Sequence, residues 1–181
     1  MENKGLVIVL TGDGKGKTTS ALGMLLRMAG HDKKACVIQF MKSSDAGYGE
    51  FKMMDRLGIE NHQVGAGCTW TVSKQATIDS IKEAWNLTKQ KVLSDGYDCI
   101  LLDELNIALS LPEIFEDKII DASEVIHLIQ QMRQQFPQRH LIITGRYAVP
   151  ELIEEADLVS EIKDIKHPYT KGIKAQRGIE F

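Results

Sequence analysis

The sequence predicts an α/β fold with a mostly parallel sheet and helices on both faces. Short apolar runs alternate with longer stretches of helical periodicity, and a glycine-rich turn joins the first run to the first helical stretch. The runs are almost continuously apolar, which is typical of strands covered by helices from both sides. Strands are expected at residues 6–10, 35–40, 98–102, 141–144 and 158–162.

The expected helices follow from apolar residues at steps of three and four. They are expected at residues 18–29, 73–94 and 150–156, and after a capping box at Asp121 and Glu124. Trp85 lies on the apolar stripe of the second helix, and we interpret it as a core residue. Residues 41–72 and the polar segment after Asp164 are irregular, and either is a candidate wall of a substrate pocket.

Length and composition indicate one domain over residues 1–181. A chain of 181 residues with 43% apolar content can bury one core. Its 22 basic and 25 acidic residues give a net charge of −3, which argues against a nucleic-acid partner. Three cysteines without metal spacing favour a reducing cytosol. No signal peptide is recognisable and no apolar run approaches the roughly 20 residues that cross a bilayer, so we expect a soluble, cytoplasmic protein with no membrane partner.

The strongest motif is TGDGKGKTT at residues 11–19, between the first strand and the first helix. The usual phosphate-binding pattern is a glycine, four residues, then Gly-Lys-Ser/Thr. Thr11 stands where the first glycine belongs, and Gly12 comes one position late, so the loop is a variant. Its lysine supplies positive charge to phosphates and the following threonine offers a hydroxyl to Mg²⁺. The candidate nucleotide-binding residues are Gly12, Asp13, Gly14, Lys15, Gly16, Lys17, Thr18 and Thr19.

This motif predicts that the chain binds a nucleoside triphosphate within a P-loop NTPase-like, RecA-like fold. The alternative is an ordinary glycine-rich turn between a strand and a helix. A second element supports the nucleotide interpretation: Asp103 and Glu104 follow the apolar run at residues 100–102, at the strand end where open α/β sheets bind ligands. One carboxylate can hold Mg²⁺ while the other orients it, although a solvated strand end is the alternative.

Seven short blocks in this sequence resemble, in order, those of the P-loop ATP:corrinoid adenosyltransferases of the cobalamin pathway. They are TGDGKGKTT at 11–19, VIQFMK at 37–42, GAGCTW at 65–70, LLDELN at 101–106, ITGR at 143–146, EADLVSEI at 155–162 and KHPYTKGIKAQRGIEF at 166–181. Each block alone is weakly specific, whereas the ordered set covers nearly the whole chain. The variant phosphate loop also resembles the family's form.

The resemblance implies transfer of the 5′-deoxyadenosyl group of ATP to a reduced Co(I) corrinoid, with release of triphosphate. Co(I) is itself a strong nucleophile, so the lack of an obvious Ser/His/Asp constellation is no objection. It further implies a Mg²⁺ ion, a reductase partner that supplies Co(I), and a homodimer.

The resemblance also assigns roles to single residues. Residues 13–19 hold the triphosphate, Lys17 being catalytic. Glu104 is both catalytic and, with Thr18 and Asp103, a metal ligand. Arg27 and Arg146 are weaker candidates for nucleotide contacts, and Arg27 is equally well read as an exposed helix residue.

The GAGCTW block concerns the corrinoid. The family uses an aromatic pair there to keep a lower ligand off cobalt, and Trp70 matches one member. Cys68 replaces the other aromatic residue, so Trp70 is expected to carry more of this catalytic role. Two other function classes remain open: a kinase or ATPase acting at the γ-phosphate, which yields ADP, and a nucleotide-binding switch or corrinoid carrier without turnover.

Overall fold

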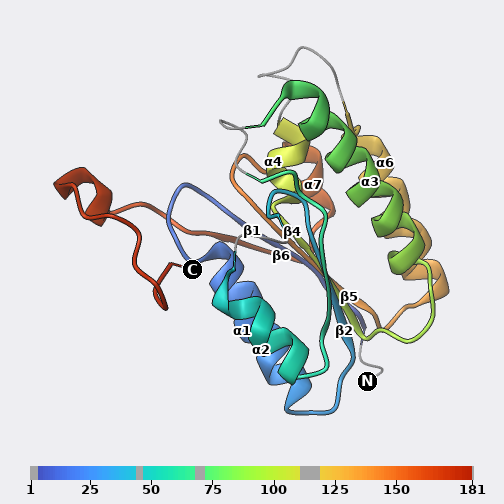
Figure 1. Ribbon diagram of the computed structural model, residues 1–181. Coiled ribbons are helices and arrows are strands. Elements are labelled where there is room, and N and C mark those ends of the chain that lie inside the picture. Colours follow the sequence, from blue (N-terminus) through green and yellow to red (C-terminus); the bar gives the residue numbers. More distant parts are fainter. Residues whose placement is uncertain (1–3, 44–46, 68–71, 111–118, 181) are drawn as a thin grey trace.

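The computed structural model describes residues 4–43, 47–67, 72–110 and 119–180. A six-stranded sheet with the order β3-β2-β4-β5-β1-β6 forms the centre, and every neighbouring pair is parallel (Figure 1). The strands are β1 (Val7–Thr11), β2 (Ala35–Gln39), β3 (Glu60–Gln63), β4 (Cys99–Asp103), β5 (His140–Thr144) and β6 (Leu158–Glu161). The predicted α/β class with a parallel sheet is confirmed.

Helices cover both faces of the sheet (Figure 1). They are α1 (Lys17–Ala29) and α2 (Gly49–Arg56) on one face, and α3 (Lys74–Val92), α4 (Leu105–Ser110), α6 (Ala122–Gln135) and α7 (Pro150–Glu155) on the other. A short 3₁₀ helix, Pro168–Lys171, lies in the C-terminal segment. Among the described residues, no helix has the length and apolar character needed to span a bilayer.

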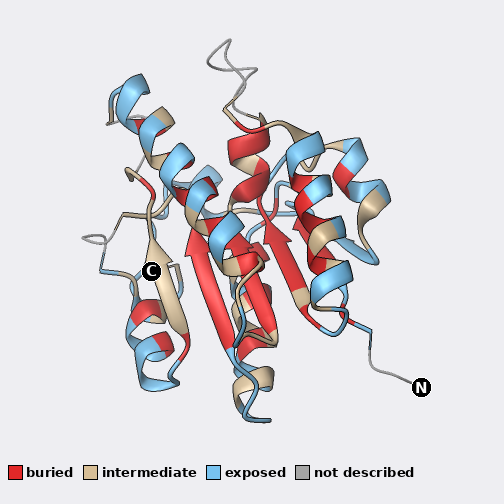
Figure 2. Ribbon diagram, turned by 90° about the vertical axis from the view of Figure 1, so that its right-hand side faces the viewer, coloured by how far each residue is buried: buried red, intermediate tan, exposed pale blue. Residues whose placement is uncertain are grey.

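The core follows the two-residue alternation of the strands. In β4, Ile100 and Leu102 pack on the face of α3 and α6, whereas Cys99 and Leu101 pack on the face of α1. The central strands are accordingly buried along their length (Figure 2). Trp85 is buried, as predicted, and its indole donates to Glu124.

Helices α6 and α4 differ in how far the sequence predicted them. The capping box at Asp121 and Glu124 is confirmed, with both reciprocal hydrogen bonds formed at the start of α6. Helix α4 was not predicted, because the sequence LNIALS directly after the acidic pair is too short to show a helical period.

The two edge strands differ from the sequence prediction. Strand β3 was missed, because its sequence ENHQ has no apolar residue and its pairing with β2 rests on backbone hydrogen bonds. Strand β6 was predicted as a strand covered on both faces, and this is wrong. It lies at the opposite edge beside β1, and all four of its residues are exposed, Leu158 and Val159 by 42% and 39%.

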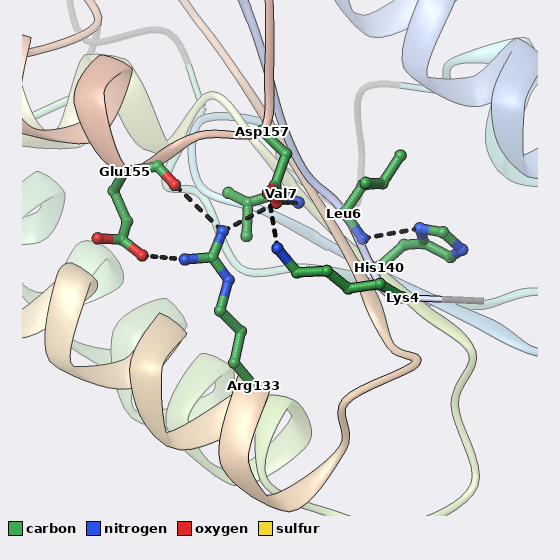
Figure 3. A network of polar contacts seen from close by, with 7 residues as sticks. All are labelled: Lys4, Leu6, Val7, Arg133, His140, Glu155 and Asp157. Carbon is green, nitrogen blue, oxygen red and sulfur yellow. Dashed lines mark hydrogen bonds and ion pairs between the residues drawn. The ribbon is translucent and has the colours of Figure 1, made fainter. Parts of the chain in front are cut away.

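A polar network fixes the start of β6 beside β1 (Figure 3). The Asp157 carboxylate accepts hydrogen bonds from the backbone N–H of Val7 at 2.9 Å, from Arg133 at 2.8 Å and from Lys4 at 3.1 Å. Arg133 also contacts the Glu155 carboxylate. One arginine of α6 therefore ties the edge strand to the body of the sheet.

We predict that Asp157→Asn lowers the free energy of unfolding by about 1.5 to 3 kcal/mol, the usual net contribution of hydrogen bonds to a charged group. Partial burial alone would raise the pKa of Asp157, but the bonds from Val7, Arg133 and Lys4 lower it to about 2. Its stabilising contribution is complete above the unfolded value of about 3.9 and is lost as the pH falls toward 2.

Urea unfolding between pH 7 and pH 2 measures this difference, with Asp164→Asn, at an exposed residue beyond β6, as the matched control. The difference in unfolding free energy between the native chain and Asp157→Asn should begin to narrow near pH 4 and be almost gone at pH 2. A gap that persists to pH 2 would show that the network does not act through the carboxylate charge.

Candidate functional site

A cavity of about 700 Å³ lies at the carboxyl edge of the sheet. Parallel strands bring their carboxyl ends together, so the segments after β1, β2, β4 and β5 all reach it. The phosphate-loop residues Asp13 to Thr19 form one wall. The rest of the lining is Leu22, Lys42, Tyr48, Gly49, Glu50, Glu104, Ile107, Arg146, Gly178, Ile179 and Glu180.

The glycines of the loop allow close backbone approach. Gly12 has φ 95°, and a Cβ there would lie 2.5 Å from the carbonyl oxygen of Ile162. A Cβ at Gly14 would lie 2.6 Å from the carbonyl oxygen of Lys163, and the Gly14 N–H donates to Ile162 at 2.7 Å. The loop therefore rests against the chain that leaves β6, and only glycine fits at these two positions.

Lys17 opens helix α1 and lies beneath the loop. Its ammonium donates to the carbonyl oxygens of Gly12 and Gly14, both at 2.7 Å. Burial lowers the pKa of Lys17, an effect that the nearby Glu104 carboxylate opposes. These contacts place a buried positive charge at the centre of the loop, where the sequence predicts the phosphates.

Thr18 and Asp103 form the second part of the site. The Thr18 hydroxyl donates to Asp103 Oδ1 at 2.8 Å, and Gln39 donates to Oδ2 at 2.9 Å. Asp103 is fully buried, and its carboxylate is already engaged by donors from neighbouring elements. It is therefore better suited to hold Thr18 in place than to bind a metal ion directly.

Of the acidic pair Asp103 and Glu104, Glu104 is the member that lines the cavity. Its backbone has φ 66°, a left-handed conformation that is uncommon for non-glycine residues. Burial, followed by the charge of Asp103, raises the pKa of the Glu104 carboxyl. The Glu104 carboxylate and the Thr18 hydroxyl are hard oxygen donors of the kind that Mg²⁺ prefers, so this donor set fits the predicted metal.

One cation of the cavity lining, Lys42, was not singled out in the sequence. Lys42 follows β2, donates to Glu50 at 2.9 Å, lies 3.6 Å from Asp103 Oδ2 and stands over the ring of Tyr48. Burial alone would lower the pKa of Lys42, but Asp103 and Glu50 raise it. Lys42 was the last residue of the VIQFMK block, so its position after a predicted strand was the available signal.

The structure brings together most of the predicted site residues but not all. Arg146 reaches the loop and donates to the Asp13 carbonyl oxygen at 3.2 Å. Arg27 is exposed in the last turn of α1, at the opposite end of the helix from the loop, and does not line the cavity. Cys68 and Trp70 lie outside the described residues.

A second group of metal-ligating residue types lies away from the cavity. Cys36, Glu60 and His62 place their ligand atoms within 4.8 Å of one another. However, Glu60 already contacts the Lys91 ammonium at 2.6 Å and accepts a hydrogen bond from Tyr97. The Lys91 ammonium is thus already paired with the Glu60 carboxylate. We therefore interpret the group as a polar network at the edge strand β3.

Comparison with known proteins identifies the family of this chain. The profile of the ATP:corrinoid adenosyltransferase BtuR/CobO/CobP family matches residues 3–181. The chain belongs to the ATP:corrinoid adenosyltransferase family. Membership confirms that the protein is an enzyme, an ATP-dependent transferase of cobalamin metabolism.

Individual relatives agree with this assignment. A corrinoid adenosyltransferase from Sinorhizobium sp is 38% identical over 184 residues, which span 99% of this chain and 82% of the relative. The corrinoid adenosyltransferase of Escherichia coli (strain K12) is 34% identical over 181 residues, 99% of this chain and 87% of the relative.

One solved structure supports the fold. The flagellar accessory protein FlaH from Methanocaldococcus jannaschii matches with a TM-score of 0.54 over 88% of this chain and 71% of that chain. Its sequence is only 8% identical, so the likeness concerns the fold alone. It agrees with the predicted P-loop NTPase-like architecture.

The C-terminal segment of this family member also reaches the cavity. It runs away from the sheet, and its end returns beside the start of α1 (Figure 1). From residue 163 to residue 180 only His167 and Glu180 are not exposed. The Glu180 carboxylate turns inward and contacts the Lys15 ammonium of the phosphate loop.

The charges of the cavity wall are therefore paired among themselves. Lys15 meets Glu180, Lys42 meets Glu50, and Arg146 meets the backbone carbonyl of Asp13 and lies 3.9 Å from its carboxylate. A polyanion that enters the cavity must exchange these partners. Among these acids, Glu180 is the one that can most easily release its lysine, because the segment that carries Glu180 is otherwise exposed.

We predict that Glu180→Gln lowers the KM for ATP by up to about fivefold, because the ion pair with the half-exposed Lys15 contributes up to about 1 kcal/mol that triphosphate binding must overcome. Steady-state kinetics with varied ATP measure the change, and Glu154→Gln, on the exposed face of α7, is the matched control. A raised KM would instead mean that Glu180 itself holds the nucleotide.

Proposed function

We propose that this enzyme transfers the 5′-deoxyadenosyl group of ATP to the Co(I) centre of a reduced corrinoid. In this reaction Co(I) attacks C5′ of the ribose, a cobalt–carbon bond forms, and the C5′–oxygen bond to the triphosphate breaks. Cobalt supplies the electron pair and becomes Co(III), while inorganic triphosphate leaves with the oxygen. Family membership together with a buried lysine at the centre of the phosphate loop carries this proposal.

The protein needs no strong base for this reaction, since the nucleophile is the cobalt centre. Its tasks are to orient C5′, to neutralise charge on the departing triphosphate and to keep water out. We assign the second task to Lys17, assisted by Lys15, Lys42 and Arg146 on the cavity wall. The backbone N–H groups of residues 13–19 are expected to hold phosphate oxygens at the start of α1.

Mg²⁺ would be held by Thr18 and Glu104, where it would offset phosphate charge. Asp103 holds the Thr18 hydroxyl from behind, with 2.8 Å between the two oxygens. The domain that performs these tasks is expected to be the whole chain, residues 1–181.

We propose that Trp70 and Cys68 belong to the acceptor side of the site. We propose that Trp70 presses on the lower face of the corrinoid and keeps a lower ligand off cobalt, while Cys68 packs nearby. A cytoplasmic reductase is proposed to supply Co(I). A homodimer is also proposed, since the exposed apolar residues Leu158 and Val159 of the edge strand β6 suit contact with a second subunit.

An anaerobic assay with ATP, Mg²⁺ and chemically reduced corrinoid tests the reaction. We expect the light-sensitive adenosylcorrinoid and triphosphate in equal amounts. ADP as the nucleotide product would instead indicate phosphoryl transfer at the γ-phosphate. ATP binding without any product would indicate a nucleotide-binding switch.

Lys17→Ala should lower kcat/KM for ATP by about 10²- to 10³-fold, the usual effect of removing one preorganised group that stabilises developing negative charge. Initial rates of adenosylcorrinoid formation measure it. Lys171→Ala, at an exposed lysine of the 3₁₀ helix, is the control and should leave the rate unchanged. Equal rates for both variants would remove Lys17 from the mechanism.

Trp70→Ala should slow turnover by about tenfold when the complete corrinoid is supplied as Co(II) with a reductase, equivalent to about 1.4 kcal/mol in the barrier. Turnover from chemically prepared Co(I) should change much less, because the lower ligand matters for the reduction. Unchanged rates from Co(II) would show that Trp70 has no part in removing that ligand.

A further inference from the structure

Three strands end in polar side chains that point to the same face of the sheet. Gln39 ends β2, Asp103 ends β4 and Thr144 ends β5, and the alternation of each strand turns them toward α1. Gln39 and Asp103 are register partners on neighbouring strands. All three side chains are fully buried, so their polar atoms need partners inside the protein. Among the polar atoms of these three side chains, Gln39 Oε1 is the one without a hydrogen-bond partner.

The Thr144 hydroxyl both donates and accepts a hydrogen bond. It donates to Asp103 Oδ1 at 2.7 Å and accepts from the backbone N–H of Glu104 at 3.0 Å. Asp103 Oδ1 also accepts from Thr18 at 2.8 Å. One hydroxyl of β5 therefore touches both members of the acidic pair, once through a side chain and once through the backbone.

The backbone bond matters because of the conformation of Glu104. With φ 66° this residue holds a left-handed conformation that is unfavourable for residues with a side chain. The Thr144 hydroxyl satisfies the Glu104 N–H in that conformation, and α4 begins immediately afterwards, with the N–H of Ile107 donating to the Glu104 carbonyl at 3.1 Å.

The residue after Thr144 leaves room for the Glu104 side chain. Gly145 has φ 128°, and a Cβ there would lie 3.2 Å from Glu104 Oε2 and 2.9 Å from the Cβ of Asn106. The Asn106 amide in turn donates to the Gly145 carbonyl at 3.0 Å. The end of β5 thus fits closely around the acidic pair.

We propose that Thr144 is a positioning residue that orders the acidic pair for the metal-bound nucleotide. It fixes Asp103 behind Thr18 and holds the Glu104 backbone so that the carboxylate faces the cavity. This inference rests on the proposed function for its metal. It adds a residue of β5 to the proposed metal ligands, which are Thr18 at the start of α1 and Glu104 after β4. Thr144 acts through these residues and does not touch the nucleotide cavity itself.

The test compares Thr144→Val, which keeps the shape and removes the hydroxyl, with Thr144→Ser, which keeps the hydroxyl. Equilibrium binding of ATP is measured with increasing Mg²⁺ and, separately, with EDTA. Thr144→Val should raise the Mg²⁺ concentration for half-maximal binding by about 10- to 100-fold, as loss of a residue that orients metal ligands does. Thr144→Ser should stay close to the native chain, and binding in EDTA should be similar for all three.

A matching Mg²⁺ requirement for Thr144→Val and the native chain would overturn the proposal, as would equal defects in both variants. So would native ATP binding that does not respond to Mg²⁺. If Thr144→Val does not fold, Thr144→Ala serves in its place, with the same shift expected. Because no turnover is measured, a failure of adenosyl transfer in the product assay would be seen separately and would not alter this result.

Discussion

The arrangement of the site depends on one buried carboxylate. Asp103 lies at the carboxyl edge of a parallel sheet with no exposed surface, and donors from three other elements meet it: Thr18 of α1, Gln39 of β2 and Thr144 of β5. A charge so deeply buried is tolerated only when it is hydrogen-bonded on all sides. Satisfying Asp103 therefore fixes the phosphate loop, the helix that follows it and two neighbouring strands in one arrangement.

That arrangement decides where the other charges of the cavity lie. Lys17 is held beneath the loop by carbonyl oxygens, and Glu104 is turned toward the cavity by an unfavourable backbone conformation. The strain at Glu104 is offset by its neighbours on β5 and α4. Such strain at a site that must bind a polyanion and a metal ion is consistent with preorganisation, in which the protein orders its groups before the ligand arrives.

The edge strands of the sheet were harder to predict from the sequence than the central strands. Central strands are defined by apolar runs, so the sequence located them to within a residue or two. Strand β3 is polar and is held by its backbone pairing with β2, whereas β6 begins with two apolar residues that are exposed. The pairing of β3 and the exposure of β6 cannot be predicted from local periodicity. Hydrogen bonding to a neighbouring strand and coverage by a helix both depend on parts of the chain that are distant in sequence.

The sequence by itself determined the parallel α/β class, the phosphate loop with Lys17 and Thr18, the acidic pair after β4 and, through ordered blocks, the resemblance to the corrinoid adenosyltransferases. Each of these signals is local, since a turn, a strand end or a short motif carries it within a few residues. Tertiary structure decided that Asp103 supports Thr18 while Glu104 faces the cavity, and that Lys42, Thr144 and Glu180 join the site. Those residues lie on separate segments, and only the pairing of the strands and the return of the C-terminal segment bring them together.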